Sequence, residues 1–287
     1  MEPLPSLLYS AMDRLLPLAF AEPTFMKRAL LAVIFLAPAA AAVGVPLVQF
    51  RMAFFSDAIG HSAFTGVALG VLLGIHPLLT MVAFGLFVAY AIALVKGRTG
   101  LSQDTVIGVF FSTVVALGIA IISARKGLTR NLQAYLYGDL LAISGAEVLW
   151  MGALFLGVVV YLGLTFNRIL LLGVEEGFAR SLGVPGRALG ISFALVVALV
   201  VTTAIRAVGI LLVTALLVVP AAAARNVARG AASAFWISIA LSLASGLSGL
   251  AASYYLDTAT GATIVLFSAA FFALTAAIGA ILDPKSP

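Results

Sequence analysis

The sequence predicts an all-α, polytopic helical membrane protein with about eight or nine transmembrane helices. Of the 287 residues, 63% are hydrophobic and only 9% are charged, whereas about a quarter of the residues in a soluble domain are charged. The apolar runs are about 20 residues long, the length of a membrane-spanning helix, and not the alternating segments of about ten residues found in outer-membrane barrels. Because no polar stretch is long enough to fold alone, we expect residues 1–287 to form a single transmembrane domain.

The net charge and the counts of cysteine and histidine restrict the class of protein further. The net charge of +5 suits a multi-pass protein of a prokaryotic inner membrane with basic cytoplasmic loops, and it does not call for nucleic acid as a partner. The absence of cysteine excludes thiolate metal sites, thiol redox chemistry and disulfides. Two histidines remain for any imidazole site, and of these His76 precedes a proline and is expected in an interfacial turn.

The first third of the chain contains a surface segment and three spans. Residues 1–24 carry charges and a proline and are too short to span, so we expect them to lie on the membrane surface. The first span contains Pro38 and Pro46, which are expected to kink it. These three spans are expected at residues 27–48, 51–74 and 77–95.

The middle of the chain alternates spans with polar connections. A fourth span ends near residue 123 and begins at Ser102 or Asp104, either of which suits a helix N-cap. Residues 125–144 are too polar to span and are expected to form a short extracytoplasmic surface or re-entrant helix, with Asp139 as a helix cap. A fifth span covers about residues 147–166.

Residues 173–185 are typical of a short amphipathic helix between two spans. Glu175 and Glu176 lie where the first turn is expected, and Gly183 opens a Gly-Val-Pro ending that stops the helix. The remaining spans are expected at residues 189–205, 207–224 and 235–254, with a last one ending at residue 282. Pro220 interrupts the hydrogen bonding of the second of these.

The basic residues favour one orientation. If the loop at residues 96–100 is cytoplasmic and nine spans alternate, nine Lys and Arg residues lie inside and seven lie outside. Residues 173–185 are then cytoplasmic, and residues 125–144 are extracytoplasmic.

The second span carries the most unusual polar residues of the chain. Asp57 and His61 are four residues apart, so they lie one turn apart on the same helix face, and Thr65 extends this polar line. Beside it runs a stripe of small residues at three- and four-residue steps, which lets neighbouring helices approach closely. The stripe consists of Gly60, Ala63, Gly66, Gly70 and Gly74.

Two interpretations of the Asp57–His61 pair are open. A carboxylate and a neutral imidazole form a reasonable half-shell for a divalent transition metal. Alternatively, the two side chains satisfy each other and lock helix packing. Because ionisable groups are costly in hydrocarbon, either interpretation places the pair toward a bundle interior or a water-filled path.

Several ordered segments resemble the ABC-3 family, the membrane permease subunits of zinc and manganese ABC importers. The similarity covers about residues 31–282. It is carried by RMAFFSDAIGHSAFTGVALG, SQDTVIGVFFSTVVALGI, LQAYLYGDLLAIS, EEGFARSLGVP and AVGILLVTALLVVPAAAARNVAR. The resemblance implies the ABC importer permease fold and a permease homodimer that forms the translocation path. It also implies two cytoplasmic ABC ATPase subunits that use ATP and an extracytoplasmic solute-binding protein that delivers the metal.

The resemblance also assigns roles to residues. Asp57 and His61 match the second-helix positions expected to contact the metal, and residues 173–185 match the coupling helix that fits a groove on the ATPase. Residues 125–144 would face the binding protein. The coupling residues implied are Glu175, Glu176, Phe178, Ala179, Arg180, Leu182 and Gly183.

The substrate class stays open at this point. Some zinc-type relatives carry a further histidine in the block that here reads GVFFSTVVALG, which leaves manganese or ferrous iron beside zinc. No G-x-x-x-x-G-K-[ST] motif is present, so the chain is not expected to be an enzyme or to have a cofactor of its own. The alternatives are an ABC permease for a metal chelate and a proton-coupled secondary metal transporter. A more distant one is an intramembrane metalloenzyme.

Overall fold

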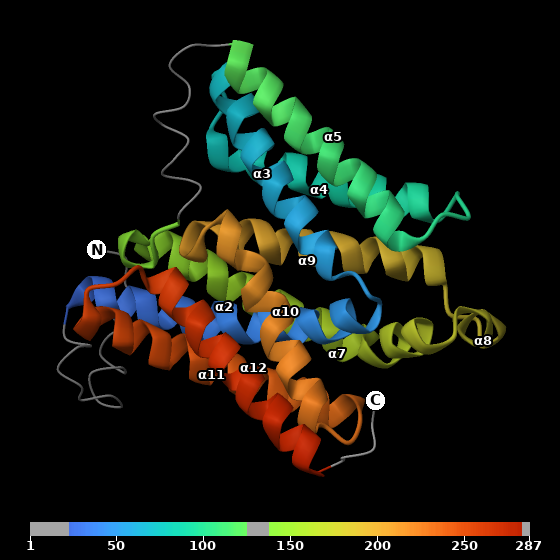
Figure 1. Cartoon of the computed structure of the whole chain (residues 1–287). Helices are drawn as coiled ribbons and strands as arrows, with labels where there is room; N and C mark the ends of the chain where they lie inside the picture. Colours follow the sequence, from blue (N-terminus) through green and yellow to red (C-terminus); the bar gives the residue numbers. More distant parts are fainter. Residues whose placement is uncertain (1–22, 125–137, 283–287) are drawn as a thin grey trace.

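The computed structural model describes residues 23–124 and 138–282, and these residues are helical apart from turns (Figure 1). The predicted all-α membrane fold is confirmed, because eight of the described helices are long and apolar enough to cross a membrane. The helices are α2 (Thr24–Gln49), α3 (Ala53–Leu73), α4 (Pro77–Lys96), α5 (Gln103–Ala124), η2 (Leu140–Ala142), α7 (Gly145–Val174), α8 (Glu176–Ser181), α9 (Gly186–Val208), α10 (Ile210–Val227), α11 (Ala231–Leu256) and α12 (Thr260–Leu282).

The helix α10 is not among these eight. It has 18 residues, contains Pro220 and is apolar over a shorter length. The prolines of α2 and α10 do not end either helix. The predictions for residues 1–22 and 125–137 lie outside the described residues. Within residues 138–144, the structure forms the single 3-10 turn η2, and the Asp139 carboxylate caps it by accepting from the backbone N–H groups of Leu141 and Ala142.

Two helix boundaries differ from the sequence prediction. The helix α7 runs for 30 residues to Val174, well beyond the expected end near residue 166. Asn167 and Arg168 are exposed, so the helix continues past them without burying a polar group. The amphipathic helix is correspondingly shorter than residues 173–185, because α8 covers only Glu176–Ser181 and is followed by Gly183 in the left-handed region at φ 74°.

The helices form two groups that meet along α9 and α10. The helices α3, α4 and α5 pack on one another on one side of the molecule, and α2, α7, α11 and α12 lie on the other side (Figure 1). The helix α4 packs on α9, and α3 packs on both α9 and α10. The helix α3, which carries Asp57 and His61, therefore lies at the junction of the two groups.

Small residues allow the helices of the second group to pack closely. A Cβ atom at Gly44 of α2 would collide with the backbone carbonyl oxygen of Leu217 in α10. Serine hydroxyls strengthen the same region, since Ser242 of α11 donates to the Ala37 carbonyl of α2 at 2.9 Å. Polar side chains and small residues thus hold α2 in the middle of the bundle, as expected inside a bilayer.

The substitution Gly44→Ala is expected to lower the thermal stability of the purified protein. The added methyl group has no space beside the Leu217 backbone, and overpacking of this kind costs about 1–3 kcal/mol. A thermal unfolding scan in detergent measures the change. Gly157→Ala is the matched control, because a Cβ at that helical glycine meets open space. Equal melting temperatures for both variants would contradict the close α2–α10 contact.

Candidate metal site

Asp57 and His61 lie half-buried on α3, in contact with different neighbouring helices. The hydroxyl of Thr214, on α10, donates to Asp57 Oδ1 at 2.5 Å. The imidazole of His61 packs against the ring of Phe111 on α5, with ring centroids 5.0 Å apart and planes at 85°. The pair is therefore placed between α10 and α5, and no direct hydrogen bond between the two side chains occurs in the structure as described.

Thr65 does not extend the polar line toward the site. Its side chain is buried, and its hydroxyl donates to the Val114 carbonyl of α5 at 2.9 Å. Gly118 leaves room for this contact, because a Cβ there would lie 2.5 Å from the Thr65 hydroxyl oxygen. The Thr65 hydrogen bond therefore joins α3 to α5. Of the predicted polar line on α3, only Asp57 and His61 are left as candidate metal ligands.

The glycine stripe of α3 provides close helix packing, as the sequence predicted. A Cβ at Gly66 would lie 2.7 Å from the Thr80 carbonyl oxygen of α4, and one at Gly70 would collide with the Thr80 hydroxyl. Gly74 instead ends the helix in the left-handed region at φ 69°. Gly66 and Gly70 fix α3 against α4, and the face that bears Asp57 and His61 lies toward α10 and α5.

The single chain supplies an incomplete metal site. Among residues 23–124 and 138–282, no cluster of three or more His, Cys, Asp or Glu side chains is close enough to hold a metal ion. Zinc in proteins is almost always four-coordinate. The Asp57–His61 pair therefore offers two ligands, and further ligands have to come from water, the substrate's own ligands or a second copy of the chain.

Thr214 is the part of the site that sequence analysis missed. It is the only polar residue in the run ILLVTALLVV, from Ile210 to Val219. Its helix starts directly after Gly209, whose φ of 85° and ψ of 164° are not helical and therefore separate α9 from α10. A lone hydroxyl in an apolar span was the available signal, but its contact with α3 depends on the packing of segments 157 residues apart.

The break between α9 and α10 is tied to the segment before α7. A Cβ at Gly138 would collide with the backbone nitrogen of Gly209, and the Asp139 N–H donates to the Arg206 carbonyl at 3.2 Å. The Arg206 guanidinium in turn pairs with Glu147 at 2.8 Å. Glu147 also closes a capping box with Ser144 at the start of α7. These contacts fix where α10 begins, at Ile210, four residues before Thr214.

The helix α8 projects at the turn between α7 and α9, at one end of the molecule (Figure 1). Phe178 and Leu182 are 55% and 60% exposed, whereas Ala179 is fully buried and anchors the helix. Glu176 and Arg180 form an exposed ion pair along α8. Phe178 of α8 and Leu182, the residue that follows the helix, thus project two large apolar side chains outward beside the exposed ion pair.

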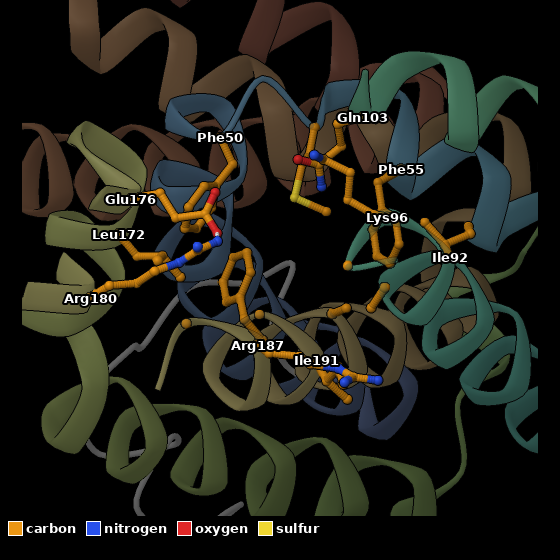
Figure 2. Close-up of a pocket in the computed structure, with 17 residues that line it drawn as sticks. Phe50, Phe55, Ile92, Lys96, Gln103, Leu172, Glu176, Arg180, Arg187 and Ile191 are labelled. Atoms are coloured by element: carbon orange, nitrogen blue, oxygen red, sulfur yellow. Dashed lines mark hydrogen bonds and ion pairs between the residues drawn. The ribbon is translucent and has the colours of Figure 1, made fainter. Parts of the chain in front are cut away.

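A pocket of about 380 Å³ lies behind α8. In Figure 2, Phe50, Leu172, Glu176 and Arg180 lie on one side of it, and Phe55, Ile92, Lys96 and Gln103 lie on the other. Arg187 and Ile191 of α9 line its floor in this view. Phe55 is two residues before Asp57, so the pocket separates α8 from the first turn of the helix that carries the pair.

Comparison with known proteins identifies the family. The model of the ABC 3 transport family matches residues 22–279. The chain is 33% identical to the high-affinity zinc uptake system membrane protein ZnuB of Haemophilus influenzae, over 86% of this chain and 95% of that protein. It is 34% identical to the manganese import system permease protein ScaB of Streptococcus parasanguinis, over 88% and 89% of the two chains.

A solved structure agrees with this assignment. PsaBC from Streptococcus pneumoniae, in complex with Fab, contains a chain that superposes with a TM-score of 0.77 at 28% identity, covering 94% of each chain. Together with the apolar helices, these relatives make the protein a multi-pass protein of a prokaryotic inner membrane. The matched family model spans nearly all of the described helices, and the chain belongs to the ABC 3 transport family.

Proposed function

We propose that this chain is the permease subunit of an ATP-driven importer of divalent transition metal ions, zinc or manganese, with Asp57 and His61 contacting the ion in transit. The observation that carries the proposal is a half-buried carboxylate and imidazole on one face of a membrane-spanning helix, in a chain of this family. Ionisable residues inside a membrane mark substrate paths by default. The relatives named for zinc and for manganese support a metal as the substrate.

The incomplete site suits a homodimer. Two copies related by a two-fold axis present the same surface to each other, so pairs near that axis combine into a site with four protein ligands. Weak or partial coordination also serves transport, because a bound ion has to leave again. Either arrangement is consistent with the two ligands that one chain provides.

We assign α8 as the coupling helix that docks on a cytoplasmic ABC ATPase, one for each permease copy. Its exposed Phe178 and Leu182 provide apolar anchors, and Glu175, Glu176 and Arg180 provide a polar rim. The short turn at Gly183 and the buried Ala179 hold it rigidly to the bundle. A solute-binding protein on the opposite side of the membrane completes the importer and delivers the metal.

Reconstitution tests the function directly. Proteoliposomes containing the permease with its ATPase and binding protein are expected to take up Zn²⁺, Mn²⁺ or Fe²⁺, with a preference for one of them, only when ATP is supplied on the ATPase side. The matched control omits the ATPase. Uptake that persists without the ATPase and follows an imposed proton gradient would instead establish a secondary transporter.

A further inference from the structure

We propose that Thr214 is a positioning residue that holds Asp57 as a one-oxygen ligand and thereby sets the preference between metals. The inference rests on the proposed function, since it requires Asp57 to contact the transported ion. It assigns α10 a part in the site, alongside α3.

The contact between Thr214 and Asp57 is specific. The hydroxyl donates to Oδ1 at 2.5 Å across a helix interface, and both side chains are half-buried. A membrane threonine commonly satisfies its hydroxyl on its own helix, as Thr202 does with the Ala198 carbonyl at 2.9 Å. Thr214 instead directs its hydroxyl to a carboxylate on another helix, where a hydrogen bond to an ionised acceptor is stronger than one to a neutral group.

The backbone around the contact is built to bring α10 close to α3. Gly60 of α3 lies in ordinary van der Waals contact range of Ile210 and Val213, since a Cβ there would be 3.5 and 3.7 Å from their side chains. Val213, the neighbour of Thr214, is fully buried. The helix α10 starts directly after Gly209, and the backbone of Gly138 packs closely against the backbone of Gly209. The Thr214 hydroxyl therefore has a fixed position relative to Asp57.

The bond leaves the two oxygens of Asp57 unequal. Oδ1 accepts a hydrogen bond from the Thr214 hydroxyl, and the described residues give Oδ2 no hydrogen-bond donor. The hydrogen bond occupies one of the two lone pairs of Oδ1 and orients the carboxylate, so Oδ2 is the less occupied oxygen and the geometry favours Asp57 as a one-oxygen ligand. Partners behind a ligating carboxylate orient it and tune the metal, and their loss typically costs about 10- to 100-fold in metal affinity.

Monodentate binding has a consequence for selectivity. Zinc takes few ligands in a tetrahedral arrangement, whereas manganese suits oxygen-rich sites with more ligands. A carboxylate free to offer both oxygens supplies one more oxygen ligand, which favours manganese over zinc. Removal of the Thr214 hydroxyl is therefore expected to shift the preference of the transporter toward manganese.

The test compares Thr214→Val and Thr214→Ser in the complete transporter with its ATPase and binding protein. Zn²⁺ and Mn²⁺ compete for uptake into proteoliposomes, and KM and the maximal rate are measured for each. We expect Thr214→Val to raise the KM for Zn²⁺ about tenfold and the KM for Mn²⁺ by less, so that the ratio of the two shifts toward manganese, and Thr214→Ser, which keeps the hydroxyl, to show the wild-type ratio. Thr214→Ala gives the same comparison if the valine variant does not assemble.

Thr203→Val is the matched control, because Thr203 is a buried threonine of α9 whose hydroxyl has no hydrogen-bond partner. It is expected to keep the wild-type ratio. A wild-type ratio in Thr214→Val, or equal losses for both metals together with a lower melting temperature, would overturn the inference. Asp57→Asn distinguishes failure of the proposed function from failure of this inference. If Asp57→Asn abolishes uptake while Thr214→Val changes nothing, the metal path through Asp57 stands and only the role of Thr214 fails.

Discussion

Asp57→Asn and His61→Ala are each expected to reduce metal uptake by the complete transporter about 100-fold or more. Loss of an outer-shell partner alone costs about 10- to 100-fold in metal affinity, and each of these changes removes a ligand itself. Asparagine keeps the shape of the side chain and can still accept from Thr214 through its amide oxygen. The loss of uptake in Asp57→Asn therefore reports the missing charge and not a collapsed α3–α10 contact.

Ser62→Ala provides the control for these two variants. Ser62 is buried on the same helix beside His61, but its hydroxyl donates only to the Ile59 carbonyl of its own helix, at 2.7 Å. It is expected to transport at close to the wild-type rate. Uptake of each metal is measured with matched amounts of assembled transporter. Wild-type rates in both Asp57→Asn and His61→Ala would show that the pair serves packing alone.

The sequence predicted those features that depend on local composition. Long apolar runs identified the spans, and the cost of ionisable groups in hydrocarbon marked Asp57 and His61 as candidate site residues, which stays a prediction. The glycine stripe of α3 likewise predicted a close contact, which the structure shows to be with Thr80 and Met81 of α4. Each of these signals lies within about 20 consecutive residues, the length of one span.

Features that depend on contacts between distant segments were not predictable. Thr214 is an unremarkable residue of an apolar span until α10 is packed against α3. Phe111 is one of several apolar residues of its span, and only the packing of α5 places its ring against His61. The helix α7 ends later than its sequence predicts, because Asn167 and Arg168 resemble a boundary, whereas their exposed side chains allow the helix to continue.

Phe178→Ala in α8 is expected to weaken the binding of the ATPase and thereby to reduce metal uptake. Phe178 is a large aromatic side chain, 55% exposed on a helix whose own anchor is the buried Ala179. Truncation of an aromatic anchor at an interface typically costs about 2 kcal/mol or more, which corresponds to an approximately 30-fold weaker complex. The affinity of the detergent-solubilised permease for its ATPase measures this loss. The additional change Leu182→Ala, which removes the second exposed apolar side chain, is expected to deepen it.

The control is Ser181→Ala on the same helix, where the hydroxyl donates only to the Phe178 carbonyl of α8 itself. This variant is expected to bind the ATPase normally. The site on α3 is built from α3, α5 and α10 and includes no residue of α8, so Phe178→Ala is expected to retain metal binding while uptake falls. A variant that loses ATPase affinity and metal binding together would place α8 in the folding of the bundle. A variant that retains both ATPase affinity and uptake would show that the ATPase docks elsewhere.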